Sequence, residues 1–122
     1  LAEKIRAGGY GLGGVLTPTG LGTPVGVDSE DAAGGTKESI VIDGKEYLLE
    51  RPIRADFAFI YGSVADKYGN VKIHGTARNF NTVMATAADV VVCQADEVIE
   101  MIDPDDVLIQ GVLVDYIVGG KN

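Results

Sequence analysis

The fold is decided by residues 55–94, which read ADFAFIYGSVADKYGNVKIHGTARNFNTVMATAADVVVCQ. Residues 55–61 form an almost continuous apolar run, which is typical of a strand buried on both faces of a sheet. Residues 88–94 (ADVVVCQ) predict a second buried strand. Residues 79–88 carry apolar side chains at helical spacing behind an asparagine cap. Because buried strands alternate with a helix, the sequence predicts an α/β domain with an open, mostly parallel sheet.

Short strands and turns are predicted around this centre. Residues 39–50 predict an inserted β-hairpin, because Asp43-Gly44 separates two β-type runs and tight hairpin turns need positive φ. Pro52 ends the pairing of the second run. The remaining expectations are a turn at 66–70, a short strand at 71–74, a solvated helical face bearing Asp96, Glu97 and Glu100, a turn at Asp103-Pro104, and extended segments at 107–110 and 112–118.

The N-terminal part of the chain is rich in glycine. Residues 1–7 predict a helix that ends at Gly8, and residues 9–26 predict a loop. Residues 28–37 (DSEDAAGGTK) are polar, and we expect them to be exposed and mobile. Residues 9–14 (GYGLGG) match the GxGxxG pattern, but the dinucleotide fingerprint needs a strand before it and a helix after it. A helix precedes this run instead, which argues against a nucleotide cofactor.

Composition and charge exclude several classes of protein. Hydrophobic residues make up 46% of the 122 residues, which is enough for a folded core. The net charge of −8 argues against nucleic acid or an anionic membrane as partner, since both need clustered Lys and Arg. No apolar run approaches the roughly 20 residues that span a bilayer. The single Cys93 is expected to be buried, and the absence of an internal disulfide and of a visible signal peptide indicates the cytoplasm.

Two segments have residues that could contact a ligand. Thr17-Pro18-Thr19-Gly20 could surround an acyl group or a carboxylate with backbone N–H groups, or it could be an ordinary structural loop. The second segment is Thr76-Ala77-Arg78-Asn79-Phe80-Asn81. In it, Arg78 could bind a carboxylate or pair with a surface acid, and Asn81 could cap the helix or bind a ligand. His74 is the only histidine and has no cysteine nearby, so no metal site is expected.

Several segments together resemble, in order and spacing, the α subunit of bacterial CoA-transferases that move CoA between an acyl-CoA and acetate or a 3-oxoacid. The chain looks most similar to the acetoacetate/butyrate–acetate enzymes of anaerobic bacteria. One departure is Ile109-Gln110-Gly111, where relatives commonly carry Thr-Pro-Gly, and it leaves the substrate subclass open. The matching segments are KIRAGG at 4–9, GLGGVLTPTGLGT at 11–23, LLERPIRAD at 48–56, DKYGN at 66–70, ARNFN at 77–81 and GVLVDYIV at 111–118.

The resemblance implies a fold, a mechanism and partners. The family fold is an open α/β sheet shared with sugar-phosphate isomerases, and residues 1–122 would be the C-terminal part of one α-subunit domain. The partners would be the N-terminal half of that subunit and a β subunit. A glutamate of the β subunit attacks the thioester and becomes a glutamyl-CoA thioester, so the chain would be inactive alone. Coenzyme A is a substrate, no cofactor is implied, and the setting would be fatty acid or ketone body metabolism.

The resemblance also implies site residues. The loop Thr17, Pro18, Thr19 and Gly20, together with Asn79 and Phe80, would lie beside the substrate, and the catalytic nucleophile would lie outside this chain. A Gly-Gly-Phe motif and an active-site glutamine of the family belong to the upstream half of the subunit. The alternative is a non-catalytic domain that reuses the same α/β core to bind an acyl-CoA or a small acid. A glutamate-bearing partner subunit would favour the enzyme.

Overall fold

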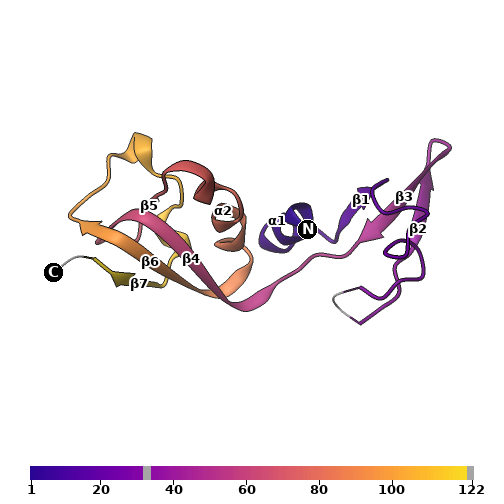
Figure 1. Cartoon of the computed structure of the whole chain (residues 1–122), viewed down its shortest axis with the longest axis horizontal. Coiled ribbons are helices and arrows are strands. Elements are labelled where there is room, and N and C mark those ends of the chain that lie inside the picture. The colour runs from indigo at the N-terminus through magenta and orange to yellow at the C-terminus, as the bar shows by residue number, and fades with distance from the viewer. Residues whose placement is uncertain (32–33, 121–122) are drawn as a thin grey trace. The chain divides into compact units, whose positions relative to one another are not determined.

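The chain divides into two units, Leu1–Ile53 and Arg54–Asn122, and each unit is built around its own sheet (Figure 1). The computed structural model describes residues 1–31 and 34–120. Within these residues, no helix has the length and apolar character needed to cross a membrane.

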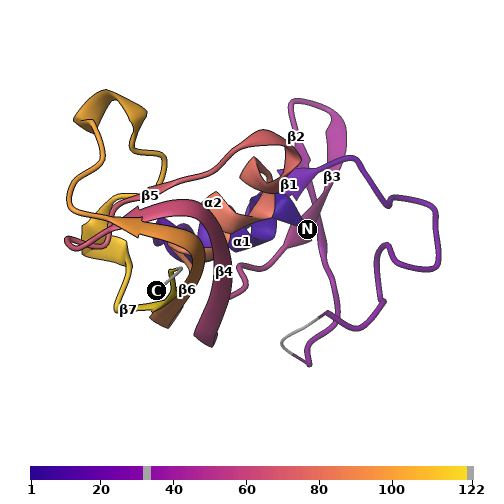
Figure 2. The same ribbon diagram turned by 60° about the vertical axis from the view of Figure 1, so that its left-hand side comes forward.

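The second unit contains a four-stranded sheet of order β5–β4–β6–β7. Its strands are β4 (Ala55–Asp66), β5 (Val71–Lys72), β6 (Ala88–Ile99) and β7 (Tyr116–Gly119). Strand β6 runs parallel to both β4 and β7, and β5 is antiparallel to β4. The parallel register extends from Ala55↔Ala88 to Asp66↔Ile99, and Figure 2 shows these two strands running side by side. The predicted α/β class with an open, mostly parallel sheet is confirmed.

A short crossover connects β5 to β6. It consists of the 3-10 helix η1 (Gly75–Arg78) and the helix α2 (Phe80–Met84), which is shorter than the predicted 79–88. The helix does not reach residue 88 because the chain there already joins the sheet. The carbonyl of Ala87 accepts a hydrogen bond from the N–H of Ala55, which begins the parallel pairing of β4 and β6. Asn79 is the helix cap, since its side chain accepts from the N–H of Phe80.

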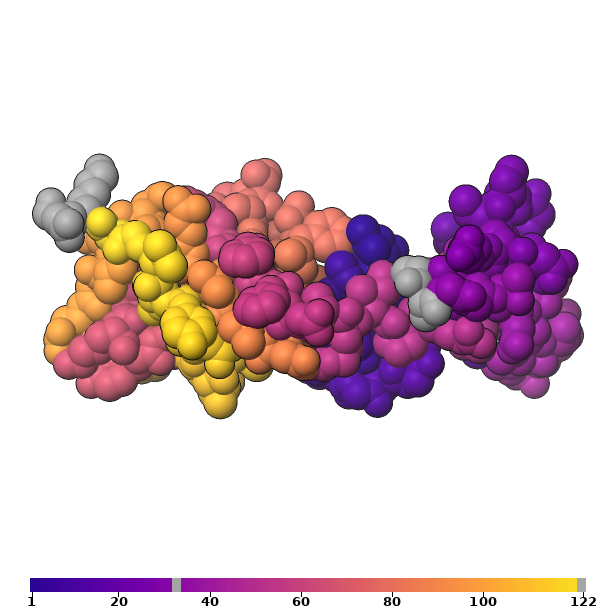
Figure 3. Space-filling model, turned by 90° about the horizontal axis from the view of Figure 1, so that it is seen from below, coloured from indigo at the N-terminus to yellow at the C-terminus, as the bar shows by residue number. Residues whose placement is uncertain are grey.

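One face of this sheet is buried and the other is open. Small and β-branched side chains of β4 and β6, such as Ala58, Ile60 and Val91, pack into a core on the α2 side. On the opposite face Phe57 and Phe59 are 59% and 73% exposed, and Tyr116 of β7 is 62% exposed. Figure 3 shows this surface, with β4 in magenta and β7 in yellow. The prediction that 55–61 is buried on both faces is therefore wrong for the part of the chain that the structure describes. Pleating points alternate side chains of β4 to the opposite face, which no described residue covers.

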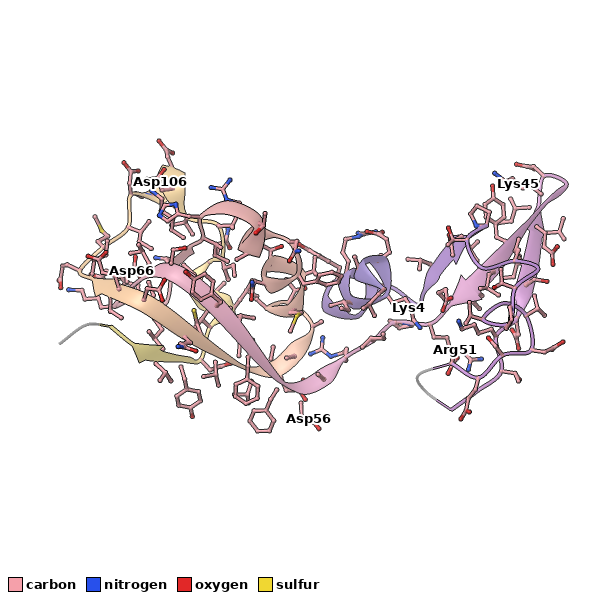
Figure 4. All side chains as sticks on the ribbon, viewed as in Figure 1. Lys4, Lys45, Arg51, Asp56, Asp66 and Asp106 are labelled. Atoms are coloured by element: carbon pink, nitrogen blue, oxygen red, sulfur yellow. The ribbon has the colours of Figure 1, made fainter. Side chains whose placement is uncertain are left out.

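The turn after β4 is organised by a buried carboxylate, Asp66 (Figure 4). Its Oδ1 accepts hydrogen bonds from the N–H groups of Tyr68 and Asn70, both at 3.0 Å. Its Oδ2 accepts from Asn70 Nδ2 at 3.1 Å and from the N–H of Ile102 at 3.0 Å. Burial alone would raise the pKa of this carboxyl, but these hydrogen bonds outweigh burial and hold the pKa below its usual value. The predicted turn at 66–70 is confirmed, and Asp66 also ties it to the segment after β6.

Two expectations about the C-terminal third need correction. Asp96 and Glu97 belong to strand β6 and Glu100 lies in a bend directly after it, so the predicted helical face is wrong, because β4 offers a pairing partner along the whole of Ala88–Ile99. The extended segment expected at 112–118 begins instead with the 3-10 helix η3 (Gly111–Leu113), and only β7 is a strand. The turn expected at Asp103-Pro104 is present and continues as the 3-10 helix η2 (Pro104–Asp106).

The first unit contains α1 (Ala2–Gly9) and an antiparallel sheet of order β1–β3–β2. Strands β2 (Ser39–Ile42) and β3 (Lys45–Glu50) form the predicted hairpin, with positive φ at Asp43 and Gly44. Strand β1 (Val15–Thr17) lies inside the segment predicted as loop, and α1 runs one residue past Gly8.

The polar segment 28–37 differs in one respect from the expectation. Asp31 is buried. Its carboxylate accepts a hydrogen bond from the N–H of Gly35 and forms an ion pair with Arg51. The segment is therefore not exposed throughout. Its mobility stays a prediction, and residues 32–33 lie outside the described residues.

Candidate functional site

The Thr-Pro-Thr-Gly loop begins where β1 ends. Pairing of β1 with β3 aligns Thr17 with Leu48, so the loop is anchored on one side to the three-stranded sheet. The N–H of Thr19 donates to Thr17 Oγ1 at 3.1 Å, and Thr23 Oγ1 donates to the carbonyl of Gly20 at 2.7 Å. Gly20 has φ +94°, a conformation that a side chain with a Cβ rarely adopts. The loop is thus a tight turn held by its own hydrogen bonds.

An open hollow of about 520 Å³ lies beside this loop, and its size is that of an ordinary small-molecule site. Thr17 and Thr19 contribute to its wall together with Val15 and Leu16. The remaining lining residues come from α1, from Leu1 just before it and from the end of β3, and they are Leu1, Ala2, Glu3, Lys4 and Glu50.

Two lining residues of the hollow, Lys4 and Glu50, form a charged cluster with Lys37, which is not itself part of the lining. Lys37 Nζ lies 3.0 Å from Glu50 Oε1, and Lys4 Nζ lies 3.2 Å from Glu50 Oε2. All three side chains are largely buried, with exposed fractions of 14%, 14% and 11% for Lys4, Glu50 and Lys37. Burial would raise the pKa of Glu50, but the two ammonium groups outweigh it and hold the pKa below its usual value. Glu50 is therefore ionised at neutral pH.

One atom of this cluster lacks a hydrogen bond. Glu50 Oε2 is buried and has no hydrogen-bond partner among the described residues, because the ion pair with Lys4 is not aligned as a hydrogen bond. Buried polar atoms are normally satisfied, so this acceptor marks a place where a hydrogen-bond donor such as water could bind.

The second predicted segment lies in the other unit. Asn79 caps α2, and Phe80 is 37% exposed. Arg78 Nε donates to the carbonyl of Ile73 at 2.8 Å, which is a structural contact. Asn81 links the helix to the sheet, because its Oδ1 accepts from the N–H of Tyr61 at 2.9 Å and its Nδ2 donates to the carbonyl of Ala77 at 2.6 Å. These contacts give Asn79 and Asn81 structural roles, and the binding role of Asn79 and Phe80 stays a prediction.

Other residues considered from the sequence have ordinary surroundings. The Gly9–Gly14 run lies between a helix and strand β1, the reverse of the strand-to-helix order in the dinucleotide fingerprint. Cys93 is fully buried, as predicted, and burial raises its pKa to about 11. In the part of the chain that the structure describes, no three His, Cys, Asp or Glu side chains gather as a metal site.

Comparison with known proteins identifies the family. The model of a family described as Coenzyme A transferase matches residues 1–120. The chain belongs to this family. The CoA-transferase resemblance found in the sequence segments is therefore confirmed.

Relatives of the CoA-transferase family match almost the whole chain. The chain is 47% identical to the Clostridium acetobutylicum acetoacetyl-CoA:acetate/butyrate CoA transferase alpha subunit and 44% identical to the Escherichia coli acetate CoA-transferase subunit alpha. Each match covers 97% of this chain and 51% of the relative. The chain thus spans about half the length of these relatives.

Solved structures support the same fold. An Escherichia coli acyl-CoA transferase, determined as a thioester complex with CoA, matches with a TM-score of 0.81 at 24% identity, over 99% of this chain and 26% of that chain. Glutaconate CoA-transferase from Acidaminococcus fermentans matches with a TM-score of 0.82 at 19% identity, over 98% of this chain and 42% of that chain. At these identities the likeness concerns the fold alone.

The charged cluster at the hollow was not predicted from the sequence. Lys4, Lys37 and Glu50 lie in three separate elements or segments, and none carries a local pattern that predicts an ion pair. The one available signal was that Lys4 and Glu50 fall inside two of the segments that resemble the CoA-transferase α subunit.

Proposed function

We propose that this chain is part of a CoA-transferase α subunit that moves CoA between an acyl-CoA and a short carboxylic acid, either acetate or a 3-oxoacid. The observation that carries the proposal is the family match over residues 1–120, joined by 47% identity to an acetoacetyl-CoA:acetate/butyrate CoA transferase alpha subunit. The rest of the α subunit and a β subunit would complete the enzyme.

The proposed mechanism is covalent. A carboxylate of a β-subunit glutamate attacks the thioester carbonyl, which gives an acyl–glutamyl anhydride and releases CoA as a thiolate. The thiolate then attacks the glutamyl carbonyl, which gives the glutamyl-CoA thioester and frees the carboxylate product. A second carboxylate reverses both steps, so one difficult exchange becomes a series of easier ones.

The Thr17–Gly20 loop would border the acyl group during this exchange. Each attack creates an oxyanion, and one preorganised N–H donor stabilises such charge by about 2.7–4 kcal/mol. The loop would shape the space beside the oxyanion, because its turn is held by internal hydrogen bonds and contains a glycine with positive φ. Asn79 and Phe80 are the second predicted contact segment.

The test is an exchange assay on the full-length protein purified with its partner subunit. Acetoacetyl-CoA and isotope-labelled acetate should yield labelled acetyl-CoA, and the 122-residue chain alone should yield none. Replacement of the partner's nucleophilic glutamate by glutamine should abolish exchange. Binding of acyl-CoA without any exchange would contradict the proposal and favour a non-catalytic binding domain.

A further inference from the structure

In the charged cluster at the hollow, the side chains of Lys37 and Glu50 are each held by two contacts, and the side chain of Lys4 is held by one ion pair among the described residues. Lys37 Nζ donates both to the carbonyl of Val25 at 2.9 Å and to Glu50 Oε1 at 3.0 Å, so its position is fixed from two sides. Lys4 has a single ion pair within residues 1–31 and 34–120, the one with Glu50 Oε2. An ammonium carries three N–H donors, so Lys4 keeps donors for a ligand.

The charged cluster carries an excess of positive charge. Lys4 and Lys37 contribute two positive charges and Glu50 one negative charge. Lys4 and Glu50 line the hollow, and Lys37 pairs with Glu50 from outside the lining. Glu3 also lines the hollow, but its carboxylate pairs with Arg6 through Nε and Nη2, so it adds no net charge. In a chain whose net charge is −8, a largely buried positive cluster beside an open hollow favours an anion.

We propose that Lys4 binds the carboxylate group of the short-acid substrate in this hollow, and that Glu50 and Lys37 position Lys4. This inference rests on the proposed function, because it names the subsite for one of the two substrates of the exchange. Lys4 is a binding residue in this proposal, and Glu50 and Lys37 are positioning residues that do not touch the acid.

The rest of the hollow matches a short carboxylate better than a phosphate. Thr17 Oγ1 accepts from the N–H of Thr19 and can still donate its own hydrogen to a carboxylate oxygen. Val15 and Leu16 offer an apolar wall for a short alkyl chain. A phosphate carries more charge and more acceptor oxygens than one ammonium and two threonine hydroxyls can satisfy, and it gains nothing from the apolar wall.

The first experiment measures binding of the carboxylate itself. Acetate is titrated into the full-length protein, purified with its partner subunit and free of acyl-CoA, and its dissociation constant is measured by NMR line broadening. Lys4→Met should weaken acetate binding about 10- to 100-fold, the loss expected for one charge-assisted hydrogen bond, while Lys4→Arg should retain most of the affinity. Lys45→Met removes an exposed lysine that begins β3 directly after the hairpin turn of the same unit, and it should leave acetate binding unchanged.

The second experiment separates this inference from the proposed function. In the exchange assay, Lys4→Met should raise the KM for the carboxylate about 10- to 100-fold and change the KM for acyl-CoA much less. Exchange that persists with an unchanged carboxylate KM overturns the inference and leaves the proposed function standing. If no exchange occurs with any acyl-CoA, the proposed function fails, and the acetate titration still decides the subsite.

Three outcomes of the titration overturn the inference directly. They are equal acetate binding by wild type and Lys4→Met, tighter binding of inorganic phosphate than of acetate, and an equal loss in Lys45→Met. If thermal melts show that Lys4→Met is unfolded, Lys4→Gln, which keeps a polar side chain of similar length, takes its place in every comparison.

Discussion

Replacement of Asp66 by asparagine should destabilise the second unit strongly. Asparagine can keep the two bonds that Oδ1 accepts from the backbone of Tyr68 and Asn70, but its NH₂ group would face Asn70 Nδ2 and the N–H of Ile102, which are also donors. Two hydrogen bonds to a charged acceptor are lost, at about 1.5 kcal/mol or more each, so the free energy of unfolding should fall by about 3 kcal/mol or more. Asp66→Asn in the full-length protein is measured by urea denaturation at pH 7.

The pH dependence gives a second, independent readout of Asp66. The pKa of Asp66 is lowered in the folded state, so the carboxylate contributes stability above its unfolded pKa of about 3.9, and this stability is lost as the pH falls through the folded pKa. The difference between wild type and Asp66→Asn should therefore shrink as the pH falls below about 4. The control is Asp106→Asn, an exposed partner of Lys72, which should leave the denaturation midpoint unchanged. An unchanged midpoint for Asp66→Asn at pH 7 would refute the reasoning.

Three further predictions concern the loop, the buried thiol and the open sheet face. Gly20→Val should lower kcat/KM in the reconstituted enzyme more than Thr19→Val, because φ +94° costs a side chain about 1–2 kcal/mol; full activity of a folded Gly20→Val protein would make the loop scaffold only. Cys93 should resist iodoacetamide at pH 8 until urea unfolds the protein, because burial raises its pKa to about 11, and alkylation of the folded protein would contradict this. The 122-residue chain alone should self-associate through the face that bears Phe57 and Phe59, and replacing both by serine should reduce association; a monomeric wild-type chain at micromolar concentration in sedimentation would count against it.

The parts of the fold that could be predicted depend on local sequence. The hairpin of residues 39–50 follows from Asp43-Gly44, because few other residues adopt the two positive φ values of the turn. The strand at 55–61 follows from its apolar run, but its exposure does not. Burial of Phe57 and Phe59 depends on what packs against that face of the sheet, and the run itself carries no information about that.

The site was predictable only in part, for a related reason. Thr17-Pro18-Thr19-Gly20 is visible because proline and glycine mark an unusual backbone. The cluster of Lys4, Lys37 and Glu50 has no local sequence pattern, because its members come together only through the pairing of β1, β2 and β3 and the placement of α1.

The loop and the charged cluster are linked through the register of β1 and β3. Val15 pairs with Glu50 and Thr17 with Leu48, so the strand that starts the loop also lies beside the carboxylate that pairs with Lys4. Gly14 permits this approach, because a Cβ there would lie 2.8 Å from the carbonyl oxygen of Glu50, closer than real Cβ contacts. A side chain at position 14 would push β1 away from β3 and move Thr17 relative to Lys4. If the hollow is a carboxylate subsite, Gly14 therefore affects substrate binding without lining it, because it sets the distance between the hydroxyl and the ammonium that share the ligand.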